Sequence, residues 1–113
     1  MNPGNSITSI SKGDLKKIFL GKSKVFTNGS PADPIDMSEG STTRNAFYQD
    51  MIKRSPEKMK AYWAKQVFSG NGIPPHDVGN AADVKGWVKG NAAAIGYIDS
   101  ADADDSVKVI PVN

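Results

Sequence analysis

Apolar residues recur at helical spacing in four stretches of the chain, and residues that cap or end helices bound these stretches. The first helix is predicted over residues 11–20, because Ser11 is a preferred helix cap and Gly21 supplies a stop. Its apolar side is expected to consist of Leu15, Ile18 and Phe19.

The second helix is predicted over residues 41–53 from apolar residues at the same spacing. Ser55 and Pro56 open a third helix, since proline is tolerated at the first helical position. Asn80 caps a fourth helix, which ends at Gly90. The residues expected on the buried sides of the third and fourth helices are Met59, Tyr62, Trp63, Val67, Val84, Trp87 and Val88.

Three short segments have the composition of strands: residues 32–37, 94–99 and 107–112. Pro34 and Pro111 favour edge positions for the first and the last, because proline cannot donate to a strand ladder. Residues 70–79 contain three glycines and two prolines and are predicted to form a loop.

Helices that alternate with short strands predict a small α/β domain over residues 1–113. A sheet of so few strands is weak by itself. We therefore expect that a partner chain, such as a second copy in a strand-swapped homodimer, pairs with an open edge near residues 94–98 and 107–112.

Composition excludes several classes of function. The chain has 113 residues, 38% of them hydrophobic and 23% charged, as in ordinary folded domains. Fourteen basic and twelve acidic residues give a net charge of +2, too small a bias to indicate nucleic-acid binding. Cysteine is absent, which excludes thiolate catalysis, disulfides and cysteine-ligated zinc. No apolar run approaches the roughly 20 residues that span a bilayer, so we expect no membrane insertion.

The stretch richest in groups that could bind a ligand is Gly40-Ser41-Thr42-Thr43-Arg44, where an extended segment enters the second predicted helix. A helix start offers unpaired N–H groups and the positive end of the macrodipole, which together can hold an oxyanion. Gly40 would let the backbone approach closely, the three hydroxyls add donors, and Arg44 adds a charged fork. From spacing alone, plain capping of the helix explains the same residues.

Other candidates are weaker. His76, the one histidine, lies in the predicted loop without partners for catalysis, and no nucleophile elbow accompanies it. The acidic cluster at residues 99–105 lacks the glycine and the distal glutamate of a calcium-binding loop, which favours a polar turn. We expect no catalytic residues, no metal site and no cofactor.

In five stretches, taken in order, the chain resembles the phosphate-binding proteins of bacterial ABC transporters, and especially their small single-domain relatives. The stretches are residues 2–6, 11–21, 39–44, 55–75 and 94–98. The resemblance implies one lobe of a type II periplasmic-binding-protein-like fold, with a short mixed sheet flanked by about four helices. In this family a glycine- and hydroxyl-rich turn at a helix start binds phosphate.

Residue by residue, Gly40, Ser41 and Thr43 match that turn, and Arg44 matches a basic residue that is common after it. Thr42 stands where the family usually has glycine, and Met37 where phosphate binders often have arginine. The length corresponds to about one lobe of a two-lobed binder. These departures imply weak binding of phosphate or a similar oxyanion.

The resemblance further implies a non-catalytic binding domain, an ABC permease as partner and a periplasmic or secreted location. The polar start of the chain has no hydrophobic signal core, so that location requires that a signal peptide was removed; otherwise the chain is cytosolic. The alternative function is a structural or interaction module that kept the lobe and lost its ligand, which Met37 and the single-lobe length favour.

Overall fold

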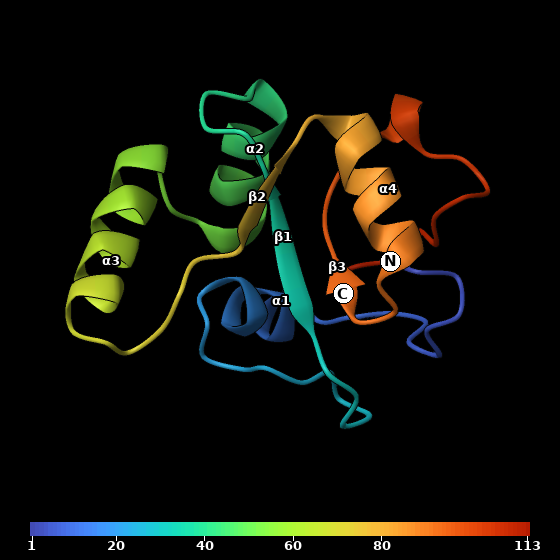
Figure 1. Cartoon of the computed structure of the whole chain (residues 1–113), viewed down its shortest axis with the longest axis horizontal. Coiled ribbons are helices and arrows are strands. Elements are labelled where there is room, and N and C mark those ends of the chain that lie inside the picture. Colours follow the sequence, from blue (N-terminus) through green and yellow to red (C-terminus); the bar gives the residue numbers. More distant parts are fainter.

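The computed structural model describes all residues from 1 to 113 and contains helices and short strands in alternation (Figure 1). The first half consists of α1 (Lys12–Phe19), β1 (Asp33–Met37), α2 (Thr42–Phe47) and the π-helical turn η1 (Tyr48–Ile52), which continues α2. The second half consists of α3 (Pro56–Phe68), β2 (His76–Gly79), α4 (Ala81–Gly90), β3 (Ala94–Ile95) and the 3-10 turn η2 (Ser100–Asp102). The α/β class and the four predicted helices are confirmed.

The three strands form one parallel sheet in the order β2-β1-β3, whereas a mixed sheet was expected. In Figure 1, α4 lies on one side of the central strand β1, and α2 and α3 lie on the other. Parallel strands place all their carboxyl ends at one edge, so the segments that follow β1 and β2 start from the same edge of the sheet.

Three of the helices begin directly after the capping residues that the sequence predicts. The side chains of Ser11, Ser55 and Asn80 each accept a hydrogen bond from the backbone N–H three residues later. Asn80 and Asp83 form a reciprocal capping box at the start of α4. The predicted second helix ends in a π-turn, where Lys53 takes a left-handed backbone conformation with φ of 64°.

The strand predictions were less accurate. Pro34 lies in the central strand and not at an edge; its missing N–H is tolerated because pairing with β2 begins only at Ile35. Residues 107–112 form no strand, and only Val112 makes a bridge, with Ile10. The predicted loop 70–79 contains β2, which pairs with β1. Of the predicted strand 94–99, only Ala94 and Ile95 form a strand, β3, which pairs with β1.

The core has two parts, one on each side of the sheet. On the side of α4, Ile35 and Met37 of β1 pack with Val84, Val88 and Ala94. The other part joins α1, η1 and α3, and it contains the fully buried Phe19, Tyr48 and Ile52. Trp63 and Trp87 pack against these clusters as half-buried side chains, while Val67, expected in the core, is half exposed. None of the helices is both long and apolar enough to cross a membrane.

Asp36 is the one charged residue buried in this core. Its carboxylate, on β1, accepts hydrogen bonds from the hydroxyls of Tyr48 and Tyr97 and lies 3.8 Å from the guanidinium of Arg44. Burial raises the pKa of Asp36, against the lowering effect of both tyrosines and of Arg44, while the charge of Asp77 raises it further. Burial beside this carboxylate in turn raises the pKa of both tyrosines.

Packing predicts opposite effects for two Gly→Ala substitutions. A Cβ at Gly96 would stand 2.9 Å from Ile35 and 3.1 Å from Val84, whereas at Gly86, on the exposed face of α4, it would meet nothing. We expect Gly96→Ala to lower the free energy of unfolding by about 1–3 kcal/mol through overpacking. Gly86→Ala should raise it by about 0.5–1 kcal/mol, since alanine favours helices. Urea unfolding checks both, and an unchanged midpoint for Gly96→Ala would contradict this packing.

The raised pKa of Asp36 predicts the direction in which folding stability changes with pH. The folded protein holds the Asp36 proton more tightly than the unfolded chain does, so this residue favours folding at low pH. That contribution is lost as the pH rises from the unfolded pKa of about 4 through the raised pKa. We therefore expect the wild type to lose stability relative to Asp36→Asn over this range, measured by urea unfolding at several pH values. A wild type that gains stability relative to the variant as the pH rises would show that the pKa is lowered instead.

Candidate anion-binding site

A hollow of about 290 Å³ lies at the carboxyl ends of β1 and β2, between the starts of α2 and α4. This edge of a parallel α/β sheet is where such folds usually place a ligand. The residues that line the hollow are Met37, Ser38, Ser41, Thr43, Gly79, Asn80, Ala81 and Asp99.

The turn between β1 and α2 forms one wall of the hollow. Gly40 takes a φ of 90°, which glycine adopts without strain, and this redirects the chain from the strand into the helix. Ser41 then caps α2, its side chain accepting from the N–H of Arg44 at 3.3 Å. The backbone N–H groups of Thr42 and Thr43 make no hydrogen bond within the chain. Two donors at a positive helix end therefore remain available to an anion.

Two of the three hydroxyls of this turn, those of Ser41 and Thr43, are already engaged with protein groups. Besides capping α2, the Ser41 hydroxyl donates weakly to the Met37 sulfur, 3.6 Å away. Thr43 donates to the carboxylate of Asp99 at 2.9 Å. An anion that used these hydroxyls would have to displace Met37 or Asp99, so the amides are the more accessible donors.

Arg44 points back toward the sheet. One guanidinium nitrogen donates to the carbonyl of Met37 at 2.8 Å and lies 3.9 Å from the carboxylate of Asp77, while the other is 3.8 Å from Asp36. The guanidinium also lies over the ring of Tyr48, 5.7 Å from its centroid. Its charge is thus shared between two carboxylates, and the side chain is only 24% exposed.

The start of α4 contributes a second positive helix end to the same hollow. Asn80 and Ala81 line it, and the N–H of Ala81 makes no hydrogen bond within the chain. The Asp83 carboxylate, however, accepts from the N–H of Asn80 at 3.0 Å and places a negative charge on this first turn. Asp99 adds another carboxylate to the lining. The hollow thus combines the positive ends of α2 and α4 with the negative charges of Asp83 and Asp99.

Of the five residues predicted for this site, Ser41 and Thr43 line the hollow. Gly40 and Thr42 are exposed and do not line it, and Arg44 is turned away toward β1. Sequence reasoning missed Asn80 and Asp99. Both follow segments that run toward the same sheet edge, and the rule that parallel strands end together could have indicated them.

Of the weaker candidates, His76 and Asp104 lie apart from this hollow, whereas Asp99 of the acidic cluster lines it. His76 is exposed on β2, its ring 5.4 Å from that of Trp87. Asp104 pairs with Lys85 at 2.9 Å and accepts hydrogen bonds from Ser106, and these contacts lower its pKa. These contacts bind the acidic segment to α4.

No family model and no curated protein matches the chain. Solved structures that match its fold include three phosphate transport proteins. A protein described as a phosphate ABC transporter substrate-binding protein from Clostridium perfringens, solved with bound phosphate, is 24% identical with a TM-score of 0.78. An ABC-type phosphate transport receptor from Vibrio cholerae is 20% identical with a TM-score of 0.77, and PstS from Borrelia burgdorferi is 17% identical with a TM-score of 0.74.

The matches cover 99%, 99% and 100% of this chain, but only 42%, 43% and 45% of the three solved chains. The chain thus spans less than half the length of these proteins. The fold implied by the sequence resemblance is confirmed: this chain is built like one lobe of the phosphate ABC transporter substrate-binding proteins.

Proposed function

We propose that the chain is a non-catalytic binding domain that holds phosphate or a similar oxyanion at the turn formed by Gly40, Ser41, Thr42, Thr43 and Arg44. One observation carries the proposal: the free amides of Thr42 and Thr43 stand at the positive end of α2, beside an open hollow at the strand ends. The fold shared with phosphate-binding transport proteins, one of them solved with bound phosphate, supports the same ligand.

Binding by this chain alone should be weak. A two-lobed binder buries its ligand between facing walls, whereas a single wall leaves the anion in water. Charges 4 Å apart attract by about 1 kcal/mol in water, against roughly 4 kcal/mol near a protein surface. Asp99 and Asp83 further oppose an anion, and Arg44 is already paired with carboxylates. We propose a dissociation constant of roughly 0.1 mM or weaker, which corresponds to about −5.5 kcal/mol of binding free energy.

In this role the domain would work outside the cytoplasm and deliver its anion to an ABC permease, as expected of a transport component. A second copy that faced the hollow in a homodimer would supply the missing wall and strengthen binding. The location and the permease partner rest on the shared fold.

The alternative function is an interaction module that kept the lobe and lost the ligand. The contacts of Arg44 favour it, because the one cationic side chain at the turn is held by Asp36 and Asp77 instead of facing the hollow. Under this alternative, phosphate has no effect on the protein.

Phosphate should stabilise the wild type. At ten times the dissociation constant, a ligand that binds only the folded state adds about 1.4 kcal/mol, seen as a rise in melting temperature. The double variant Ser41→Ala/Thr43→Val should lose this rise, because without the Ser41 cap and the Thr43–Asp99 hydrogen bond the first turn of α2 no longer holds the free amides of Thr42 and Thr43 in place. Ser55→Ala, which removes the corresponding cap of α3, is the matched control and should keep the rise while losing about 1 kcal/mol of stability. Sodium chloride at equal ionic strength controls for salt. A double variant that responds like the wild type would place the anion elsewhere.

Removing a carboxylate from the lining should strengthen binding. Asn at position 99 can still accept from Thr43, so Asp99→Asn removes a negative charge and keeps the contact. We expect phosphate to bind about fivefold more tightly, equivalent to ~1 kcal/mol. Asp105→Asn makes the same charge change at an exposed position outside the lining and should leave the affinity unchanged. Titration calorimetry at low salt measures both. Equal gains in the two variants would mean that only net charge matters, and no gain for Asp99→Asn would exclude this hollow.

A further inference from the structure

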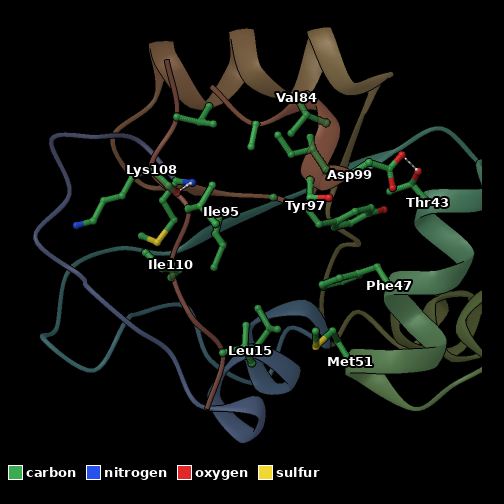
Figure 2. A pocket seen from close by; sticks show the side chains of 18 of the residues that line it. Leu15, Thr43, Phe47, Met51, Val84, Ile95, Tyr97, Asp99, Lys108 and Ile110 are labelled. Atoms are coloured by element: carbon green, nitrogen blue, oxygen red, sulfur yellow. Dashed lines mark hydrogen bonds between the residues drawn. The ribbon is translucent and has the colours of Figure 1, made fainter. Parts of the chain in front are cut away.

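Large apolar side chains are exposed at the end of α3 and in the loop that follows it. Phe68, the last residue of α3, is 95% exposed, Ile73 in the loop is 79% exposed, and Val67 is half exposed. The loop leads into the start of β2, whereas the anion hollow lies at the carboxyl end of that strand, so the two surfaces are at opposite ends of β2 (Figure 1). A second wall over the hollow would therefore leave this end of the molecule uncovered. The aromatic and apolar residues that line the cavity in Figure 2 belong to the other side of the molecule and take no part in this surface.

The outward face of α3 has its own apolar stripe. Phe68 follows Met59 by nine residues, or about two and a half turns of an α-helix, so it lies opposite this buried side chain. Ala61 and Ala64 share the face of Phe68, because positions i, i+3 and i+7 lie on one side of a helix, and both alanines are exposed. Exposed lysines stand on both sides of this narrow stripe: Lys58, Lys60 and Lys65.

Positive charge is concentrated on the same segment. Residues 53–68 carry five basic side chains and one acidic one, whereas the whole chain has a net charge of only +2. The rest of the chain is therefore net negative, and the positive potential is local to α3. Among these five cations only Lys60 has an ion pair, 3.7 Å from Glu39, and both of these side chains are largely exposed. The outward face of α3 thus offers unpaired cations to an anionic surface.

The combination of charge and apolar groups narrows the choice of partner. A second copy would set lysines against lysines, because a symmetric dimer uses the same patch on both subunits. Single-stranded nucleic acid is bound through several aromatic platforms, whereas Phe68 is the one aromatic ring among the exposed large apolar side chains. A helix face with lysines beside an apolar stripe is typical of helices that lie in the interface of a bilayer.

We propose that the outward face of α3, together with Ile73, binds the surface of an anionic lipid bilayer without crossing it. In this arrangement Phe68 and Ile73 are seated among the lipid headgroups. The lysine stems lie along the apolar stripe, and their ammonium groups pair with the lipid phosphates. The anion hollow, at the other end of β2, remains open to the solvent.

The test uses the whole chain and sedimentation with two kinds of vesicle, one of pure phosphatidylcholine and one that also contains phosphatidylglycerol. We expect partitioning to be at least tenfold stronger with phosphatidylglycerol, because each basic side chain near an anionic surface contributes about fivefold. Added salt should weaken it. Equal partitioning into both kinds of vesicle, or none into either, would overturn the proposal.

One pair of variants tests the apolar contact. Phe68→Ser should weaken partitioning into the anionic vesicles by about tenfold, because a phenylalanine side chain is no longer removed from water. Val109→Ser is the matched control, since it removes an apolar side chain that is equally open to solvent but lies outside α3 and its loop. It should leave partitioning unchanged. Both positions are exposed, so the urea midpoints should stay near that of the wild type. Equal losses in the two variants would overturn the proposal.

A second pair tests the charges. Lys58→Gln/Lys65→Gln should weaken partitioning by about twentyfold, from about fivefold for each cation. Lys12→Gln/Lys89→Gln makes the same change in net charge at exposed positions of α1 and α4 and should have little effect. Equal losses would mean that net charge alone matters, which contradicts a contact through α3. A polyglutamate peptide and a single-stranded oligonucleotide complete the test. If either binds through Lys58 and Lys65 while the vesicles do not bind, the partner is an acidic protein or a nucleic acid and the proposal is overturned.

Discussion

The buried carboxylate of Asp36 connects the parts of the molecule on which the site depends. It lies in the central strand and is bonded to Tyr48 at the end of α2 and to Tyr97 after β3, while Arg44 of α2 lies beside it. A buried charge must be paired and hydrogen-bonded, so these groups cannot move apart independently. This constraint fixes the direction of α2 relative to the sheet, and with it the place where the free amides of Thr42 and Thr43 open.

The same constraint explains why anion binding should be modest. Arg44, which the sequence offers as a phosphate ligand, serves to neutralise carboxylates around β1. Attraction for an anion then comes from two helix ends, each worth typically less than 1 kcal/mol at an exposed position, and Asp99 opposes it. The protein thus has the framework of a phosphate-binding lobe, with little charge directed at the ligand. A second wall would change this balance by removing water from the hollow.

Local signals in the sequence sufficed for the helices, because a cap acts within one turn of its own residue. Ser11, Ser55 and Asn80 begin α1, α3 and α4 as their chemistry predicts. Strands depend on partners that are distant in sequence: β2 is a strand because β1 lies beside it, whereas residues 107–112 have strand composition but make only a single bridge, between Val112 and Ile10. The orientation of Arg44 could not be predicted from the sequence either, since its partners Asp36 and Asp77 come from two different strands. The turn itself was predictable, because a hydroxyl residue such as Ser41 is a preferred cap at a helix start.

The central claim is that the start of α2 accepts an oxyanion through its free amides. Titration of the ¹⁵N-labelled protein with phosphate, followed by amide chemical shifts, tests it most directly. The account predicts saturable shifts that are largest for Thr42 and Thr43 and absent in a matched chloride titration. Shifts that are absent, or that centre on another part of the chain, would contradict it.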